Sequence, residues 1–216
     1  MRIRVISVLV ILIISVLSFL SALYPQKMYD IRLGSDTDGS SGIFRDHLGR
    51  DVFFRSLGAE YRLLSICAIT VIYFLIIYSI FRFVRKKRPA LKTTVTFLKD
   101  ISLILPLVPF FLFMNSVGSG WMILSFMTAF FFLSARHEEI CINNLLRESC
   151  LLVLFTTIIV IDVEFFTHIG PAPSFGNMLA AFKNGNADIM SSIIPFCILL
   201  LHITAFGTLV CRGEKE

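Results

Sequence analysis

Residues 164–179 read Glu-Phe-Phe-Thr-His-Ile-Gly-Pro-Ala-Pro-Ser-Phe-Gly-Asn-Met-Leu, an acidic apolar segment that runs into a loop punctuated by proline and glycine. A last apolar stretch with Pro195 follows, and then Ala205, Phe206 and a charged tail. A soluble domain has no need of this arrangement. The sequence therefore predicts a short, stiff, non-helical connection at the outer end of two membrane helices.

The composition predicts an all-α integral membrane protein. Of the 216 residues, 56% are hydrophobic, and the mean hydropathy is +0.81. A membrane helix needs about 20 apolar residues to cross a hydrocarbon core of about 30 Å. The long uncharged runs predict six spans and one domain over residues 1–216, with an outer loop at 25–62 and an inner loop at 136–148. The spans are expected at 5–23, 63–83, 101–115, 119–135, 149–168 and 191–211.

The basic residues predict the orientation of these spans. Cytoplasmic segments of membrane proteins carry an excess of Lys and Arg, and the densest basic stretch of this chain lies between Arg82 and Lys99. Both termini are therefore expected in the cytoplasm. The first apolar run is longer than the roughly 7–15 residues of a signal-peptide core, which favours an uncleaved helix over a signal peptide.

Several chemical classes find no support in the sequence. The five cysteines fall in spans or inner segments and form no CxxC pair, which argues against a disulfide framework or a zinc site. His137 and Glu138 do not extend to HExxH, and the sequence contains neither a phosphate-binding loop nor a GxSxG nucleophile motif. We therefore expect neither an enzyme nor a bound cofactor in this chain.

The loops contain two segments with helical spacing. Residues 46–57 place apolar and charged side chains on different helix faces, and this pattern predicts an amphipathic helix lying on the outer membrane surface. Residues 136–148 predict a second short amphipathic helix on the inner side. Before the first of these, residues 33–42 are turn-rich but lack the closing Glu of a calcium loop, so a solvated loop is favoured.

Polar residues and prolines inside the predicted spans are the candidates for function. Pro106 begins a pair of prolines that would bend the third span, either by design or as a tolerated kink. Asp162 and Glu164 lie towards the outer end of the fifth span, where a role in a pathway and an interface-anchored charge are both open. Because they are two positions apart, they face different sides of a helix. His202 is interpreted as a hydrogen-bonded buried histidine.

These motifs, taken in order, resemble the second permease subunit of bacterial dipeptide, oligopeptide and nickel ABC importers. That family carries a G-T-D-x-L-G-R-D-V-x-S-R motif before its second helix, and this chain has a partial match from Asp46 to Arg55. The family also carries P-x-P-S-W-G-x-M-L, and the match here runs from Pro171 to Leu179, with Phe175 in place of Trp. Asp100, Pro106 and Pro195 lie where the family has similar residues. The resemblance covers about residues 42–212.

The resemblance implies a type I ABC importer permease fold in a bacterial cytoplasmic membrane. It implies a homologous permease partner, two ATPase subunits that bind ATP and Mg²⁺, and an extracytoplasmic binding protein, with no nucleic acid. The implied translocation pathway contains Pro106, Asp162, Glu164 and His168. The implied surface towards the binding protein contains Gly49, Arg50, Asp51, Pro171, Pro173, Phe175 and Asn177. The implied ATPase-coupling loop contains Glu138, Glu139, Asn143, Asn144 and Arg147.

The inner loop is the main departure from the family pattern. The family holds a long E-A-A-x-x-x-G segment there, whereas this chain has only residues 136–148 and lacks the glycine. Two hypotheses follow. The chain is either a transport subunit that imports a peptide or a nickel-type chelate, or a structural subunit that completes the assembly while its partner couples to ATP.

Overall fold

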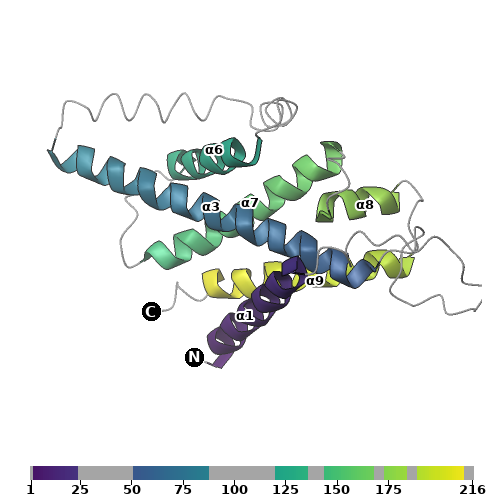
Figure 1. Cartoon of the computed structure of the whole chain (residues 1–216). Coiled ribbons are helices and arrows are strands. Elements are labelled where there is room, and N and C mark those ends of the chain that lie inside the picture. Colours follow the sequence, from purple (N-terminus) through teal and green to yellow (C-terminus); the bar gives the residue numbers. More distant parts are fainter. Residues whose placement is uncertain are drawn as a thin grey trace, which may run out of the picture. The chain divides into compact units, whose positions relative to one another are not determined.

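The computed structural model describes residues 2–23, 51–87, 120–135, 144–167, 173–183 and 189–211 (Figure 1). Within these ranges the chain is helical and contains no strand, which confirms the all-α prediction. The helices are α1 (Arg2–Leu23), α3 (Val52–Lys87), α6 (Gly120–Ala135), α7 (Leu145–Thr167), α8 (Phe175–Lys183) and α9 (Ile189–Cys211).

Three of these helices are long and apolar enough to cross a membrane. The apolar segments are Val5–Leu23 in α1, Val52–Phe83 in α3 and Ser192–Cys211 in α9, and Trp121–Leu133 in α6 is a shorter apolar segment. The expected spans at 5–23, 63–83 and 191–211 fall on these three helices. The protein is thus a helical membrane protein by the length and composition of its helices, and the count of six spans stays a prediction.

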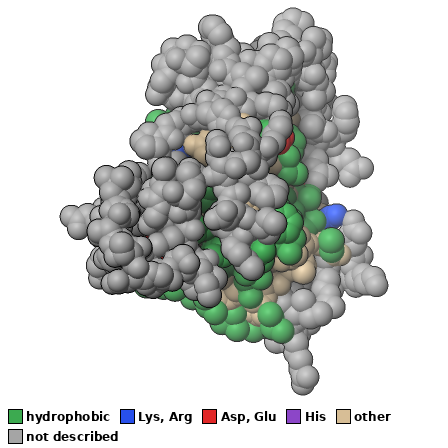
Figure 2. Space-filling model, turned by 90° about the vertical axis from the view of Figure 1, so that its right-hand side faces the viewer, with side chains coloured by type: hydrophobic (Ala, Val, Ile, Leu, Met, Phe, Trp, Pro, Cys, Tyr) green, Lys and Arg blue, Asp and Glu red, His purple; other side chains and the backbone are tan. Residues whose placement is uncertain are grey.

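Large apolar side chains project outwards from the membrane-length helices. On α1, Ile6 is 58% exposed and Leu12 is 56% exposed, and on α9, Phe196 is 54% exposed. Hydrophobic side chains also dominate the described part of the face seen in Figure 2. A surface this apolar is unfavourable in water but is the ordinary surface of a helix that contacts lipid or another membrane helix.

The α3 helix begins earlier than the sequence analysis expected. It starts at Val52 and continues to Lys87 without a break, so residues 52–62 are its first turns and not part of an outer loop or a separate surface helix. Asp51 caps this end, since its Oδ1 accepts the Phe54 N–H at 3.0 Å. The apolar and charged residues of 52–57 were correctly assigned to a helix, but they extend the second span.

The described helices divide into two compact units. The first contains α1, the first turns of α3 up to Leu64, the end of α7 from Val160, α8 and α9. The second contains α3 from Ser65, α6 and α7 up to Ile159.

In the first unit, α1 packs on α9 (Figure 1). The less exposed positions of α1 repeat at helical spacing, and they include Ser7, Ile11, Ile14, Ser18 and Ser21. The Ser7 hydroxyl hydrogen-bonds the Thr208 hydroxyl of α9. Small side chains let membrane helices approach closely, and this explains why three buried serines, Ser7, Ser18 and Ser21, lie on the inner side of an otherwise apolar helix.

In the second unit, aromatic side chains fill the core between α3, α6 and α7. Phe74, Ile77, Ala129 and Leu152 are buried together. The Phe74 ring meets the Phe132 ring edge-on with centroids 5.9 Å apart. This edge-to-face arrangement is favourable because the positive edge of one ring meets the negative face of the other, and it determines how the two rings pack.

Several hydroxyl side chains within the helices form local hydrogen bonds. Thr70, Thr156 and Thr157 each donate to the backbone carbonyl four residues earlier, at 2.7–2.9 Å. A hydroxyl placed in this way has an acceptor within its own helix, which accommodates the polar group in an apolar medium.

Some predictions concern residues outside the described ranges. They are the span at 101–115 with Pro106, most of the outer loop with Gly49 and Arg50, the inner-loop residues Glu138, Glu139 and Asn143, and the residues His168 and Pro171.

Candidate functional site

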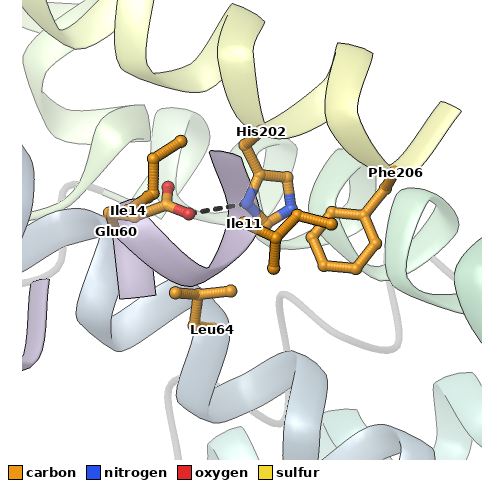
Figure 3. Close-up of a pocket in the computed structure, with 6 residues that line it drawn as sticks. All are labelled: Ile11, Ile14, Glu60, Leu64, His202 and Phe206. Carbon is orange, nitrogen blue, oxygen red and sulfur yellow. Dashed lines mark hydrogen bonds and ion pairs between the residues drawn. The ribbon is translucent and has the colours of Figure 1, made fainter. Parts of the chain in front are cut away.

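A carboxylate and a histidine meet in the interior of the first unit. The Nδ1 atom of His202, from α9, lies 2.6 Å from Oε1 of Glu60, from α3 (Figure 3). The side chains are 1% and 0% exposed. This is a short, strong hydrogen bond between two titratable groups that the helices exclude from solvent.

The pair joins two of the membrane-length helices. His202 is near the middle of the segment Ser192–Cys211, about 15 Å from either end at about 1.5 Å per residue. Ile11 and Ile14, which lie beside the pair, are near the middle of Val5–Leu23. Glu60 lies nearer the start of its own segment, Val52–Phe83.

A small cavity adjoins the pair, and its walls are otherwise apolar. Ile11 and Ile14 come from α1, Leu64 from α3 and Phe206 from α9 (Figure 3). The cavity gives the centre of a water molecule a volume of about 10 Å³, about the minimum that holds one water. The Phe206 ring packs on the imidazole with centroids 4.8 Å apart. The enclosed space beside the pair is therefore about the size of one water.

One carboxylate oxygen in this cavity has no protein partner. Oε2 of Glu60 is buried and accepts no hydrogen bond from the part of the chain that the structure describes. Ionisable side chains inside a membrane are costly, so such residues are retained mainly at functional positions. Oε2 of Glu60 is thus left able to accept a further hydrogen bond.

A second polar cluster joins the end of α7 to the start of α8. Glu164 is buried, and its Oε1 lies 3.6 Å from Nε of Arg62 in α3. Its Oε2 accepts the Gly176 N–H at 3.4 Å. The carboxylate thus satisfies one of the orphan N–H groups of α8 and interacts favourably with the positive end of its dipole.

The Ser-Phe-Gly-Asn-Met sequence begins α8 at this cluster. The Ser174 hydroxyl accepts the Asn177 N–H at 3.2 Å, so Ser174 is the N-cap. Met178 then lies against α3, where its Sδ is 3.9 Å from the Ser56 hydroxyl. Residues 175–179 are therefore helical, and the expectation of a wholly non-helical connection is wrong for this part.

Asp162 and Glu164, the predicted pathway residues of α7, lie on different faces of this helix. Asp162 is exposed and Glu164 is buried, which confirms that they face different sides of the helix. Asp162 is not part of the Arg62–Glu164 cluster. The structure brings neither residue into the Glu60–His202 pair by any described contact.

The other predicted site residues differ in burial. Pro173 and Phe175 are buried, and Asp51 and Asn177 are half-buried. In the inner segment, Asn144 is exposed and Arg147 is half-buried. The proposed contacts of these residues with a binding protein or an ATPase stay predictions.

Sequence reasoning missed Glu60 and Arg62. Both were assigned to the outer loop, because the span was expected to begin at 63. A signal was nevertheless present, since Glu60 lies in the run Leu57-Gly58-Ala59-Glu60, where apolar and small residues surround one acid. An acid in such a run and a histidine in another apolar span are candidates for pairing, because each needs a polar partner in the membrane.

Comparisons with known proteins find no match. This holds for protein-family models, for characterised proteins and for solved structures. Among the described residues, no group of three His, Cys, Asp or Glu side chains is placed to hold a metal ion. The site is therefore interpreted from its own geometry.

Proposed function

We propose that this chain is a membrane-embedded subunit of a transport system. The observation that carries the proposal is the Glu60–His202 pair, buried between membrane-length helices beside a small cavity. Ionisable groups inside a membrane are costly, and they typically mark the pathway of an ion or substrate. Apolar side chains of similar volume would stabilise the packing of these helices equally well, so packing alone does not explain the pair.

The finer proposal is a permease subunit of an ABC importer for peptides or nickel-type chelates. Its support is the motif resemblance over residues 42–212. In such an assembly this chain would pair with a second permease, and ATPase subunits would supply the driving force. The binding protein would choose the substrate, and the chain would act as a conduit and not as an enzyme.

A direct test uses the intact complex, purified through a tag on this chain. Replacement of residues 136–148 by a Gly/Ser linker should leave assembly intact and abolish hydrolysis of ATP that the binding protein stimulates. Loss of stimulation with retained assembly supports a coupling subunit. If the chain purifies without any ATPase or second permease, this result contradicts the importer proposal.

A structural subunit of the same assembly is the second candidate. The short inner loop favours it, since a coupling segment must make different contacts in two states. In this case the Gly/Ser linker leaves both hydrolysis and uptake unchanged. Glu60→Gln in the same complex separates the candidates further, because a pathway residue alters uptake and a remote structural residue does not.

A further inference from the structure

We propose that α1 is a movable cover over the Glu60–His202 pair, a helix that separates from α9 and α3 to open the space beside the pair and returns to close it. The proposal goes beyond the transport function and does not depend on the importer assignment. Three observations carry it: the place of α1 beside the pair, the small side chains in its contact, and the space that remains beneath it.

Two side chains of α1 lie beside the pair. Ile11 and Ile14 are half-buried, and they line the cavity together with Glu60 and His202 (Figure 3). The other lining residues come from α3 and α9, so α1 supplies one apolar wall of this space. Movement of α1 away from α3 and α9 would therefore open the space on one side.

The contact that holds α1 is built from small side chains. Between Val5 and Leu23 the buried residues are Ser7, Ser18 and Ser21, and no large apolar side chain of this segment is buried. The buried share of an 18-residue apolar stretch is 17% in α1, compared with 33% in α3 and 28% in α9. Of these three membrane-length helices, α1 thus has the fewest positions held by protein contacts.

The forces between membrane helices make such a contact reversible. Helices in lipid gain little from burying apolar surface, so their association depends on close packing and on hydrogen bonds. For α1 these contacts include the hydrogen bond between Ser7 and Thr208 and the tilted contact of the Phe19 and Tyr61 rings, with centroids 6.4 Å apart. Phe19 is 54% exposed and Tyr61 is 39% exposed. Lipid can replace much of this contact, so α1 is expected to exchange between two positions.

The packing of α1 is incomplete where it covers the pair. A volume of about 10 Å³ for the centre of a water molecule remains between side chains of α1, α3 and α9. Side chains around such a space make fewer dispersion contacts than they would in a filled core. The isoleucines of α1 therefore close the space without being tightly held there, as a cover that moves requires.

The test measures the distance between α1 and α9 in the full chain in lipid nanodiscs. The five native cysteines are replaced by alanine, and spin labels are attached through Leu12→Cys on α1 and Phe196→Cys on α9, two positions that are 56% and 54% exposed. Double electron–electron resonance should show two distances. Labels at Phe53→Cys on α3 and Phe196→Cys are the matched control and should show one, because the Glu60–His202 bond holds α3 to α9.

Three changes assign the second distance to the separation of α1. Cysteines in place of Ser7 and Thr208, whose hydroxyls are in contact, can form a disulfide, and its oxidation should leave one distance. Thr208→Val removes the hydrogen bond and keeps the shape, so it should raise the population of the separated form by about threefold, the average effect of one such bond. Thr204→Val should leave that population unchanged, because the Thr204 hydroxyl is exposed and bonds within α9.

Three outcomes would overturn the proposal. A single distance between α1 and α9 in the reduced chain would show that α1 is fixed. A second distance that persists after the disulfide forms, or that also occurs between α3 and α9, would place the motion elsewhere in the unit. If the disulfide does not form, the reduced chain and its control decide alone. None of these outcomes bears on the transport proposal, which is judged by uptake and by the composition of the purified complex.

Discussion

Gly176 lies so close to Glu164 that a β-carbon at position 176 would come within 2.5 Å of the Phe165 backbone nitrogen and 2.7 Å of the Glu164 carbonyl carbon. The start of α8 therefore rests directly on the backbone of α7, and only glycine permits this approach. The same approach lets the Gly176 N–H reach the Glu164 carboxylate. One glycine thus fixes both the packing and the polar contact at this junction.

Gly176→Ala should destabilise the first unit by about 1–3 kcal/mol, because backbone atoms on α7 cannot move aside as a flexible side chain would. Chemical denaturation in detergent measures this. Gly207→Ala in α9 is the matched control, since a β-carbon there meets nothing within 4 Å. It should be neutral or stabilise the chain by up to about 1 kcal/mol, because alanine favours a helix. Equal effects of the two changes would contradict the close approach.

The Arg62–Glu164 pair should show energetic coupling. Arg62→Gln and Glu164→Gln each leave one partner of a largely buried contact without its opposite charge, whereas the double change removes both charges. We expect the double variant to be more stable than the sum of the single losses predicts, by about 1 kcal/mol. A double-mutant cycle of unfolding free energies measures this coupling. Strict additivity would show that the 3.6 Å contact contributes nothing.

Two helix caps offer parallel tests of local stability. Ser174→Ala removes the acceptor for the Asn177 N–H, and Asp51→Ala removes the acceptor for the Phe54 N–H. Each change should cost about 1 kcal/mol. The losses should be smaller in Ser174→Asn and Asp51→Asn, which retain a capping oxygen. If the Asn variants are as unstable as the Ala variants, the caps are not the cause.

The aromatic core of the second unit should be sensitive to truncation. Phe74 is 0% exposed, so Phe74→Ala leaves a cavity and should cost about 3–5 kcal/mol. Phe196→Ala removes the same side chain from a position that is 54% exposed on α9. Because lipid or detergent replaces the lost contacts there, its cost should stay below about 1 kcal/mol. Unfolding in detergent compares the two variants.

Cysteine reactivity tests the predicted topology. Cys197 and Cys211 are both exposed, but Cys197 lies within the apolar segment of α9 and Cys211 at its last residue. Only a thiolate reacts quickly, and hydrocarbon disfavours the thiolate. In single-cysteine variants, a water-soluble maleimide should label Cys211 from the cytoplasmic side and leave Cys197 unlabelled. Labelling of Cys211 from the outer side would reverse the expected orientation.

The difference between what the sequence shows and what only the folded structure shows is clearest at α3 and α9. The apolar runs at 63–83 and 191–211 were visible without a structure, because membrane helices need long uncharged segments and their composition alone reveals them. The start of α3 was not visible. Residues 52–62 contain Arg55, Glu60 and Arg62, and charges inside a candidate span normally argue for a loop. Their helical state depends on partners that lie far away in the chain.

Each partner comes from a different helix, and no local pattern shows it. Glu60 is held by His202, and Arg62 lies beside Glu164. The sequence by itself determined that this is a helical membrane protein, that Asp162 and Glu164 face different sides of α7, and that His202 is buried. Only the tertiary structure decided that Glu60 pairs with His202 and that Gly176 rests on α7. Hydrophobicity is a property of each segment, whereas a buried charge is tolerated only where folding brings its partner within hydrogen-bonding distance.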